Sequence, residues 1–162
     1  MILVTGSLWI KRGYRSIGVV IHELALEAKS EAILTLYTPG STPEPAEDLL
    51  KILLEKAITV RVIVNGWNFQ PEHFKGVLLR FKEKHPKRLK IYNFKNYRGS
   101  VLHAKVFVID GRKAIIGSSN LSWSGMYNNF EMAVLLEGKD AERVRQLLYA
   151  LIRSSLCQEI TG

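Results

Sequence analysis

The sequence predicts an α/β fold in which a mixed β-sheet is flanked by helices on both faces. Short apolar runs of strand length alternate along the chain with longer segments of helical periodicity, the pattern of strands connected by helices. The pair Asp110-Gly111 lies between two apolar runs and predicts a tight hairpin, so part of the sheet is expected to be antiparallel. A chain of 162 residues has the length of one hydrophobic core, and we expect residues 1–162 to form a single domain.

The expected elements follow in order from these periodicities. Ile17, Ile21 and Leu24 recur at helical spacing, and the Pro43-Glu44-Pro45 segment introduces a second helix. Helices are expected over residues 14–29, 43–56, 71–84 and 140–154. Strands are expected over residues 32–37, 60–64, 89–94, 101–109, 114–116 and 131–136.

Positive charge is concentrated in one segment. The chain carries a formal net charge of +8 and has a pI near 9.7, which favours polyanionic partners such as nucleic acid or acidic membrane surfaces. Residues 75–98 contain nine basic side chains and one acidic side chain, Glu83, and so hold a charge equal to that of the whole chain. A solvated helix face is the ordinary meaning of such a run. Lys95 and Arg98 are candidates for substrate binding because they precede the motif below by a short link.

Cysteine usage and hydropathy bear on the compartment. Cys157 is the only cysteine, so no intrachain disulfide is possible, and a cytoplasmic protein is expected. The apolar residues 1–10 lack a basic leading region and are too short to span a bilayer. We therefore expect neither a signal peptide nor stable membrane insertion.

One continuous stretch, HAKVFVIDGRKAIIGSSN, contains the candidate site. In an extended strand over residues 101–109, His103 and Lys105 point to the same face. The hairpin then returns through residues 114–116 to Gly117, whose following Ser118 and Asn120 come back beside that face. The spacing predicts a phosphate site.

The residue types suit phosphodiester chemistry. An imidazole such as that of His103 can attack phosphorus or carry a proton near neutral pH, and the Lys105 ammonium can stabilise a non-bridging oxygen. Ser118 and Asn120 supply neutral hydrogen-bond donors. Asp110 stands beside the turn glycine, where a turn or ion-pair role is expected. Because the lysine would repel a divalent cation, we expect no catalytic metal and no cofactor.

The spacing H-x-K-x4-D-x6-G-S-x-N resembles the signature of the phospholipase D superfamily, and every specified position is present, Gly117 included. The resemblance covers about residues 101–136 and implies a phospholipase D-like α/β sandwich. It also implies two steps: one histidine attacks phosphorus to give a phosphohistidine, and a second histidine protonates the leaving oxygen and then activates water. Glu131, eleven residues after Asn120, stands where many members carry an acidic residue that hydrogen-bonds the catalytic histidine.

Members with this mechanism use two copies of H-x-K-x4-D, and this chain has one. His22, His73 and His85 have no lysine two residues later, so none of them supplies a second copy. Two chains are then expected to form one site across a two-fold interface. This matches the short, single-motif branch, whose members are homodimeric and largely nucleases.

Three functions remain open. The first is a homodimeric, metal-independent endonuclease acting on DNA or RNA, with nucleic acid as its partner. The second is a phospholipid-hydrolysing phosphodiesterase, which needs an apolar surface for acyl chains. The third is a non-catalytic nucleic-acid-binding module, against which the intact His103 and Lys105 count, since binding alone requires no nucleophile.

Overall fold

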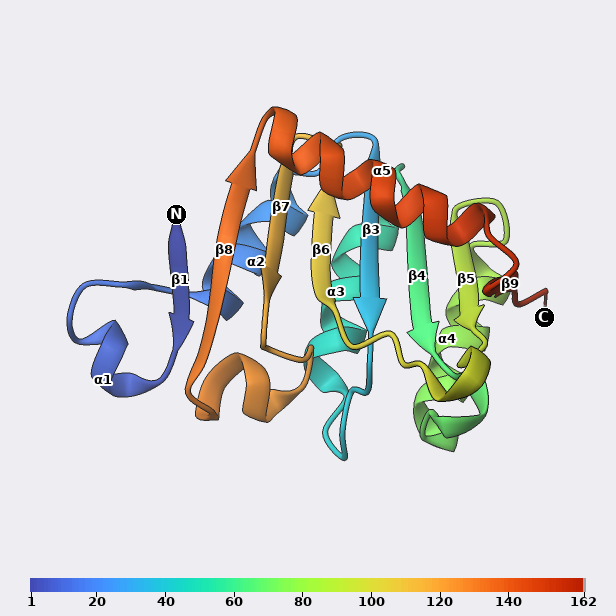
Figure 1. The fold of residues 1–162 in the computed structure, drawn as a ribbon, viewed down its shortest axis with the longest axis horizontal. Coiled ribbons are helices and arrows are strands. Elements are labelled where there is room, and N and C mark those ends of the chain that lie inside the picture. The colour runs from blue at the N-terminus through green and yellow to red at the C-terminus, as the bar shows by residue number, and fades with distance from the viewer. Residues whose placement is uncertain (162) are drawn as a thin grey trace.

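A computed structural model describes residues 1–161, which contain nine β-strands and five α-helices (Figure 1). The strands are β1 (Ile2–Thr5), β2 (Arg15–Ser16), β3 (Glu31–Leu36), β4 (Thr59–Asn65), β5 (Leu89–Phe94), β6 (Lys105–Ile109), β7 (Lys113–Gly117), β8 (Glu131–Glu137) and β9 (Cys157–Glu159). The α-helices are α1 (Ser7–Ile10), α2 (Ile17–Glu27), α3 (Glu44–Glu55), α4 (Glu72–Lys84) and α5 (Lys139–Arg153). Shorter helical turns are η1 (Trp67–Phe69), η2 (Tyr97–Gly99) and the π-helical η3 (Ser124–Asn128).

All nine strands belong to one mixed sheet, which confirms the predicted fold class. Their order is β2-β1-β8-β7-β6-β3-β4-β5-β9. The neighbours β3, β4 and β5 are parallel, whereas β6, β7 and β8 form an antiparallel run that joins them at β3. The antiparallel run contains the motif, so the hairpin is built into the middle of the sheet.

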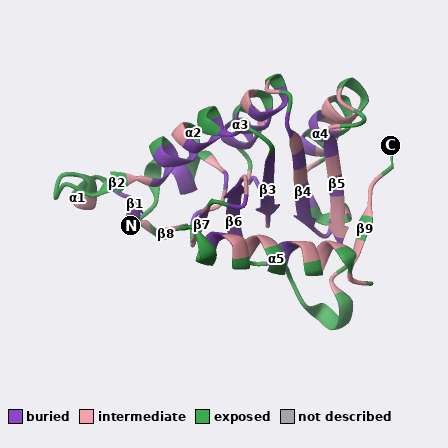
Figure 2. Cartoon of the chain, turned by 90° about the horizontal axis from the view of Figure 1, so that it is seen from above, coloured by how far each residue is buried: buried purple, intermediate pink, exposed green. Residues whose placement is uncertain are grey.

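Helices cover both faces of the sheet (Figure 2). The helices α2, α3 and α4 lie on one face, where Leu34, Leu50 and Phe74 are fully buried. The helix α5 crosses the other face and packs through Leu148 against a smaller cluster that includes Val108. Because both faces of its centre are buried, every residue of β3 is buried, as expected for the interior of an α/β sheet.

Local signals at the ends of α3 and α5 agree with the predicted boundaries. The helix α3 has Pro45 and two acidic residues, Glu44 and Glu47, in its first turn, where the free N–H groups favour negative charge. The helix α5 has 15 residues, with Asp140 at its start and Arg153 in its last turn. Within residues 1–161, none of the helices combines the length and the apolar character that a bilayer crossing requires.

The prediction of a strand over residues 101–109 was wrong in its first half, because β6 begins only at Lys105. The ladder between β3 and β6 reaches Leu34 opposite Phe107. At the next position of β3, the Thr35 hydroxyl replaces backbone pairing: it accepts from the Val106 N–H at 2.9 Å and donates to the Ala104 carbonyl. His103 therefore lies in the loop before the strand.

Three short strands and the helix α1 were not predicted. The strands β1 and β2 lie at one edge of the sheet, and β9 lies at the other, paired with β5. The predicted helix over residues 14–29 was too long at its start, because residues 15 and 16 pair with β1 instead. Edge strands of two to four residues depend on a partner that a local sequence pattern does not reveal.

Candidate active site

The signature residues meet at one edge of the sheet, the lower edge in Figure 1. The strands β3 and β4 end there, β6 begins there, and β7 returns there, so that Lys105 lies opposite Gly117. In the next strand, Ala133 lies opposite Gly117, which places Glu131 at the same edge. The fold thus brings His103, Lys105, Ser118 and Glu131 into one neighbourhood.

His103 is exposed, but the backbone on both sides of it is held. The Leu102 N–H donates to Asn65 Oδ1 at 2.8 Å, and the Ala104 carbonyl accepts from Thr35. The Tyr37 ring packs edge-on against the imidazole, with 4.6 Å between ring centroids. An exposed histidine on a fixed backbone suits a nucleophile, because it is accessible and already oriented.

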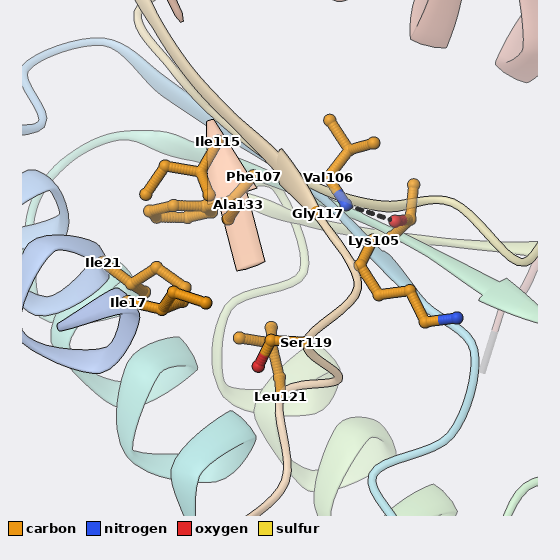
Figure 3. Close-up of a pocket in the computed structure, with 11 residues that line it drawn as sticks. Ile17, Ile21, Lys105, Val106, Phe107, Ile115, Gly117, Ser119, Leu121 and Ala133 are labelled. Atoms are coloured by element: carbon orange, nitrogen blue, oxygen red, sulfur yellow. Dashed lines mark hydrogen bonds between the residues drawn. The ribbon is translucent and has the colours of Figure 1, made fainter. Parts of the chain in front are cut away.

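Lys105 is buried, with 9% of its surface exposed, and its Nζ lies 4.8 Å from the centroid of the Tyr37 ring. Its stem and the side chains of Ile17 and Phe107 line an apolar cavity of about 20 Å³ (Figure 3). In Figure 3 the ammonium points away from that apolar cluster. Burial lowers the pKa of Lys105, against the negative charge of Glu131, which raises it. The lysine is therefore a partly desolvated cation facing the site.

Gly117 is required by the close approach of two strands. A Cβ atom at this position would lie 2.5 Å from both the Met132 carbonyl oxygen and the Ala133 Cβ. Any side chain would push β7 away from β8 and displace the Ser118 that follows. This packing explains the glycine of the signature without a chemical role.

Ser118 and Glu131 form a hydrogen-bonded pair. The Ser118 hydroxyl donates to Glu131 Oε2 and accepts from the Met132 N–H at 3.2 Å, while Asn129 Nδ2 donates to Glu131 Oε1 at 3.0 Å. Within residues 1–161 Glu131 thus bonds Ser118 and Asn129, and no hydrogen bond joins it to His103 of the same chain. Nearby, Asn120 Oδ1 is buried and has no hydrogen-bond partner among residues 1–161.

Asp110 lies at the other end of β6, away from His103. Its carboxylate accepts hydrogen bonds from the backbone N–H groups of Lys29, Ser30 and Glu31 and from the Ser30 hydroxyl. Burial acts to raise the pKa of Asp110, but these hydrogen bonds together lower it below its ordinary value. The residue ties the β6–β7 turn to the segment that enters β3.

The basic segment is divided between the two ends of the sheet. Lys95 and Arg98 follow β5 at the edge that contains His103, and both are exposed. Lys84 is the last residue of α4, and Lys87 and Arg88 lie between α4 and β5, at the opposite edge. The position of Lys95 and Arg98 is therefore compatible with their predicted role in substrate binding, whereas the basic segment as a whole does not lie at the site.

The sequence did not point to Thr35, Tyr37 or Asn65. Thr35 lies in β3, Tyr37 directly follows β3, and Asn65 is the last residue of β4. Thr35 bonds the backbone of the motif, Asn65 bonds the backbone of Leu102 just before it, and Tyr37 contacts the side chains of His103 and Lys105. The strands were predicted, but the order of strands in the sheet decides which of their ends meet the motif. No group of three or more His, Cys, Asp or Glu side chains in residues 1–161 is arranged to hold a metal ion.

A histidine and a lysine on one edge of a mixed sheet, beside a Gly-Ser-x-Asn loop, form the arrangement that the phospholipase D signature implies. The chain belongs to the phospholipase D superfamily: the family model described as "Cardiolipin synthase, PLD-like domain" matches residues 21–151. That match includes all residues of the signature. Members of this superfamily act on phosphodiester bonds.

Among curated proteins, the chain is 27% identical over 142 residues to the DISARM protein DrmC of Bacillus paralicheniformis. The aligned region covers 87% of this chain and 58% of that protein. It is 29% identical over 140 residues to cardiolipin synthase A of Erwinia tasmaniensis. The aligned region covers 78% of this chain and 27% of that protein. The chain thus spans little more than half of the first relative and about a quarter of the second.

Two solved structures match nearly end to end. Nuc of Salmonella typhimurium, a phospholipase D family member, superposes with a TM-score of 0.74 at 17% identity, covering 100% of this chain and 99% of that one. NucT of Helicobacter pylori gives 0.73 at 15% identity, with 99% of both chains covered. These likenesses establish the shared fold.

Proposed function

We propose that this protein is a metal-independent phosphodiesterase, an endonuclease that hydrolyses DNA or RNA through a phosphohistidine at a site shared by two chains. The observation that carries the proposal is the exposed His103 beside the buried ammonium of Lys105, in a chain with a single copy of the motif. Residues 1–162 are proposed to act as one catalytic domain without a cofactor. The lone Cys157 favours a cytoplasmic location.

In the first step, an imidazole nitrogen of His103 attacks phosphorus. The P–N bond forms as the bond from phosphorus to the leaving oxygen breaks, and that oxygen takes a proton from His103 of the partner subunit. In the second step, the partner's His103 removes a proton from water, the water oxygen attacks phosphorus, and the P–N bond breaks. This step frees the His103 imidazole and releases the phosphate product.

The other signature residues have supporting roles in this proposal. Lys105 stabilises the negative charge that develops on the non-bridging oxygens, and its low-dielectric surroundings strengthen that interaction. Asn120 contributes a neutral donor to the same oxygens. Glu131 acts through Ser118, whose hydroxyl it holds. Lys95 and Arg98 hold the substrate backbone at the rim.

An exposed apolar surface supports the second chain. Ile2, Met132 and Val134 are 56%, 53% and 45% exposed and share the sheet face that α5 crosses, since Ala133 and Leu135 pack on the α2 side. In Figure 1 no helix lies in front of β1 or the lower half of β8. Met132 directly follows Glu131, so this surface adjoins the site. A two-fold contact there would bury it and bring two copies of His103 together.

Nucleic acid is the favoured substrate because of charge. The chain has a net charge of +8, and Lys95 and Arg98 lie at the same edge as His103. A second candidate, a phospholipid, is favoured by the similarity to cardiolipin synthase A over 140 residues. One experiment separates the two substrates.

The test is cleavage of labelled single-stranded and duplex DNA and RNA beside labelled phosphatidylcholine, each with and without chelator. We expect hydrolysis of nucleic acid that persists in chelator, because Lys105 supplies the positive charge. His103→Ala should abolish this activity without changing the fold. Cleavage of phosphatidylcholine alone would establish the second candidate, and loss of all activity in chelator would contradict the mechanism.

The shared site is tested with a mixed dimer. A dimer of one wild-type chain and one His103→Ala chain is isolated by means of a different affinity tag on each chain. It should retain far less than half of wild-type activity. The reason is that one nucleophile would lack its partner acid. A mixed dimer with half the activity would mean that each chain contains an independent site.

A further inference from the structure

A groove of about 440 Å³ adjoins His103 on the side of β4 and β5. It lies where these strands end, between the turn η1 and the turn η2, at the lower edge in Figure 1. Its lining residues are Tyr37, Thr38, Asn65, Phe69, Asn96, Gly99 and Val101. The volume is that of a small-ligand site, and the lining mixes aromatic, amide and hydroxyl groups.

The groove is continuous with the catalytic residues. Tyr37, which lines it, also packs against His103, and Val101 precedes His103 by two residues. Its floor is rigid because Asn65 Oδ1 accepts from both Leu102 N–H and Asn96 Nδ2, each at 2.8 Å. A group bound here would lie next to the reacting phosphate.

An exposed aromatic ring forms one wall. Phe69 is 76% exposed, more than any other large apolar side chain described in residues 1–161. The turn that presents it is held firmly: Gln70 Nε2 donates to the carbonyls of Asn65 at 2.7 Å and Tyr37 at 3.1 Å, and Trp67 N–H donates to an Asn93 side chain. A ring held in water on a fixed turn is available to a planar partner.

The opposite wall has an unusual backbone conformation. Asn96 and Arg98 have φ angles of 50° and 52°, in the left-handed region that side chains other than glycine rarely adopt. The Asn96 conformation is held by bonds from its Nδ2 to Asn65 and to the Ser100 carbonyl. The result is an exposed Arg98 at the rim, its guanidinium 5.1 Å from the Tyr97 ring centroid. Positive charge therefore lies next to Gly99, which lines the groove.

We propose that this groove binds the nucleobase next to the scissile phosphate of a single-stranded nucleic acid, with the base stacked on Phe69 and the neighbouring phosphate held by Arg98. The inference rests on the proposed nuclease function and adds a preference for single strands. Stacking on an aromatic side chain tolerates all bases, so little sequence preference is expected. A base in a duplex is paired and stacked on both faces and must leave the helix before it can enter.

The experiment combines a protein change with a base deletion. Wild type, Phe69→Ala and Phe69→Tyr are assayed for kcat/KM on a single-stranded oligonucleotide and on the same strand with abasic nucleotides on both sides of one cleavage position. We expect about 10-fold loss at that position from the abasic change in wild type and about 10-fold loss from Phe69→Ala on the intact strand. The two losses in kcat/KM should not add, so that Phe69→Ala should cause little further loss on the abasic strand. Phe69→Tyr keeps the ring and should restore wild-type behaviour.

The matched control is Leu147→Ala, which truncates another exposed apolar side chain, 71% exposed on α5, and should leave both rates unchanged. Equal loss by Phe69→Ala on the intact and abasic strands, or no loss on either, would overturn the inference while leaving the nuclease function intact. Failure of wild type to cleave any oligonucleotide would overturn the proposed function itself, and this inference with it.

Discussion

Each end of the sheet has one buried charged side chain among residues 1–161, but only the one far from the site is ion-paired. At the end far from His103, Glu31 is 8% exposed and bonds to Arg61 at 3.1 Å, to Arg145, and to the Tyr149 hydroxyl at 2.7 Å. At the site end, Lys105 is equally buried, and within residues 1–161 no carboxylate lies within ion-pair distance of its ammonium. The paired end secures the fold, and the unpaired ammonium is the group that we propose binds a phosphate.

The pKa values express the same contrast. The pKa of Asp110, at the paired end, is lowered because hydrogen bonds outweigh the effect of burial, so its charged form is stabilised. The pKa of Lys105 is lowered because burial dominates, so its charged form is destabilised. An unpaired buried charge costs folding free energy and gains a partner only when substrate binds.

Lys105→Met gives the largest expected effect. Removing the ammonium should reduce kcat by about 100-fold or more, since it withdraws a preorganised charge from the reacting phosphate. The same change should raise the melting temperature at neutral pH, because a desolvated cation is replaced by an apolar chain of similar length. Steady-state kinetics and thermal unfolding by circular dichroism measure the two. A variant that is both less active and less stable would show that the ammonium is paired in solution.

Asp110→Asn, at the paired end, should lower the stability of the fold and leave the activity unchanged. We expect a loss of about 1–3 kcal/mol of folding free energy, because the charge that strengthens the hydrogen bonds is removed. The lowered folded-state pKa means that this stabilisation is present above the ordinary carboxyl pKa, about 3.9, and is lost as pH falls through the lower folded value. Denaturant unfolding between about pH 2 and 7 should show a flatter acid limb for the variant, with unchanged kcat at pH 7.

Thr35→Val probes the support beneath the motif. Losing the hydroxyl leaves the Val106 N–H and the Ala104 carbonyl without their partner, which should cost about 1–2 kcal/mol of stability. Because Thr35 positions the backbone rather than touching substrate, kcat should fall more than KM changes. The matched control is Thr5→Val, since the buried Thr5 hydroxyl has no partner among the described residues. That variant should be at least as stable as wild type; equal destabilisation would contradict the assigned role.

The smallest effect is expected from the basic residues. Neutralising Lys95 and Arg98 to glutamine should weaken nucleic-acid binding several-fold and reduce the slope of log affinity against log salt by about 0.7 per contact on single strands. Neutralising Lys84 and Lys87, at the opposite edge, removes the same charge and should change the slope little. Fluorescence anisotropy across a salt series measures both. Equal slopes for the two variants would mean that only total charge matters.

Local sequence was sufficient to propose the reacting groups and to predict most of the helices and strands. The spacing of His103, Lys105, Ser118 and Asn120 indicated the chemistry, because a β-hairpin has few ways to place residues at fixed separations. Apolar periodicity indicated α2 to α5 and the central strands, since each element buries one continuous face or both. One copy of the motif in 162 residues led to the proposal of a second chain.

Tertiary structure alone decided what surrounds those groups. Strand order placed the end of β3 against the start of β6, so Tyr37 meets both His103 and Lys105, and Thr35 ends the ladder that the alternation pattern had extended to residue 101. It also brought Glu131 into a hydrogen bond with Ser118 and divided the basic segment between the two edges of the sheet. Finally, it formed a groove between the turns η1 and η2, which are far apart in sequence. The physical reason is that pairing between distant strands is set by burial of the whole sheet, and no local pattern encodes which ends will meet.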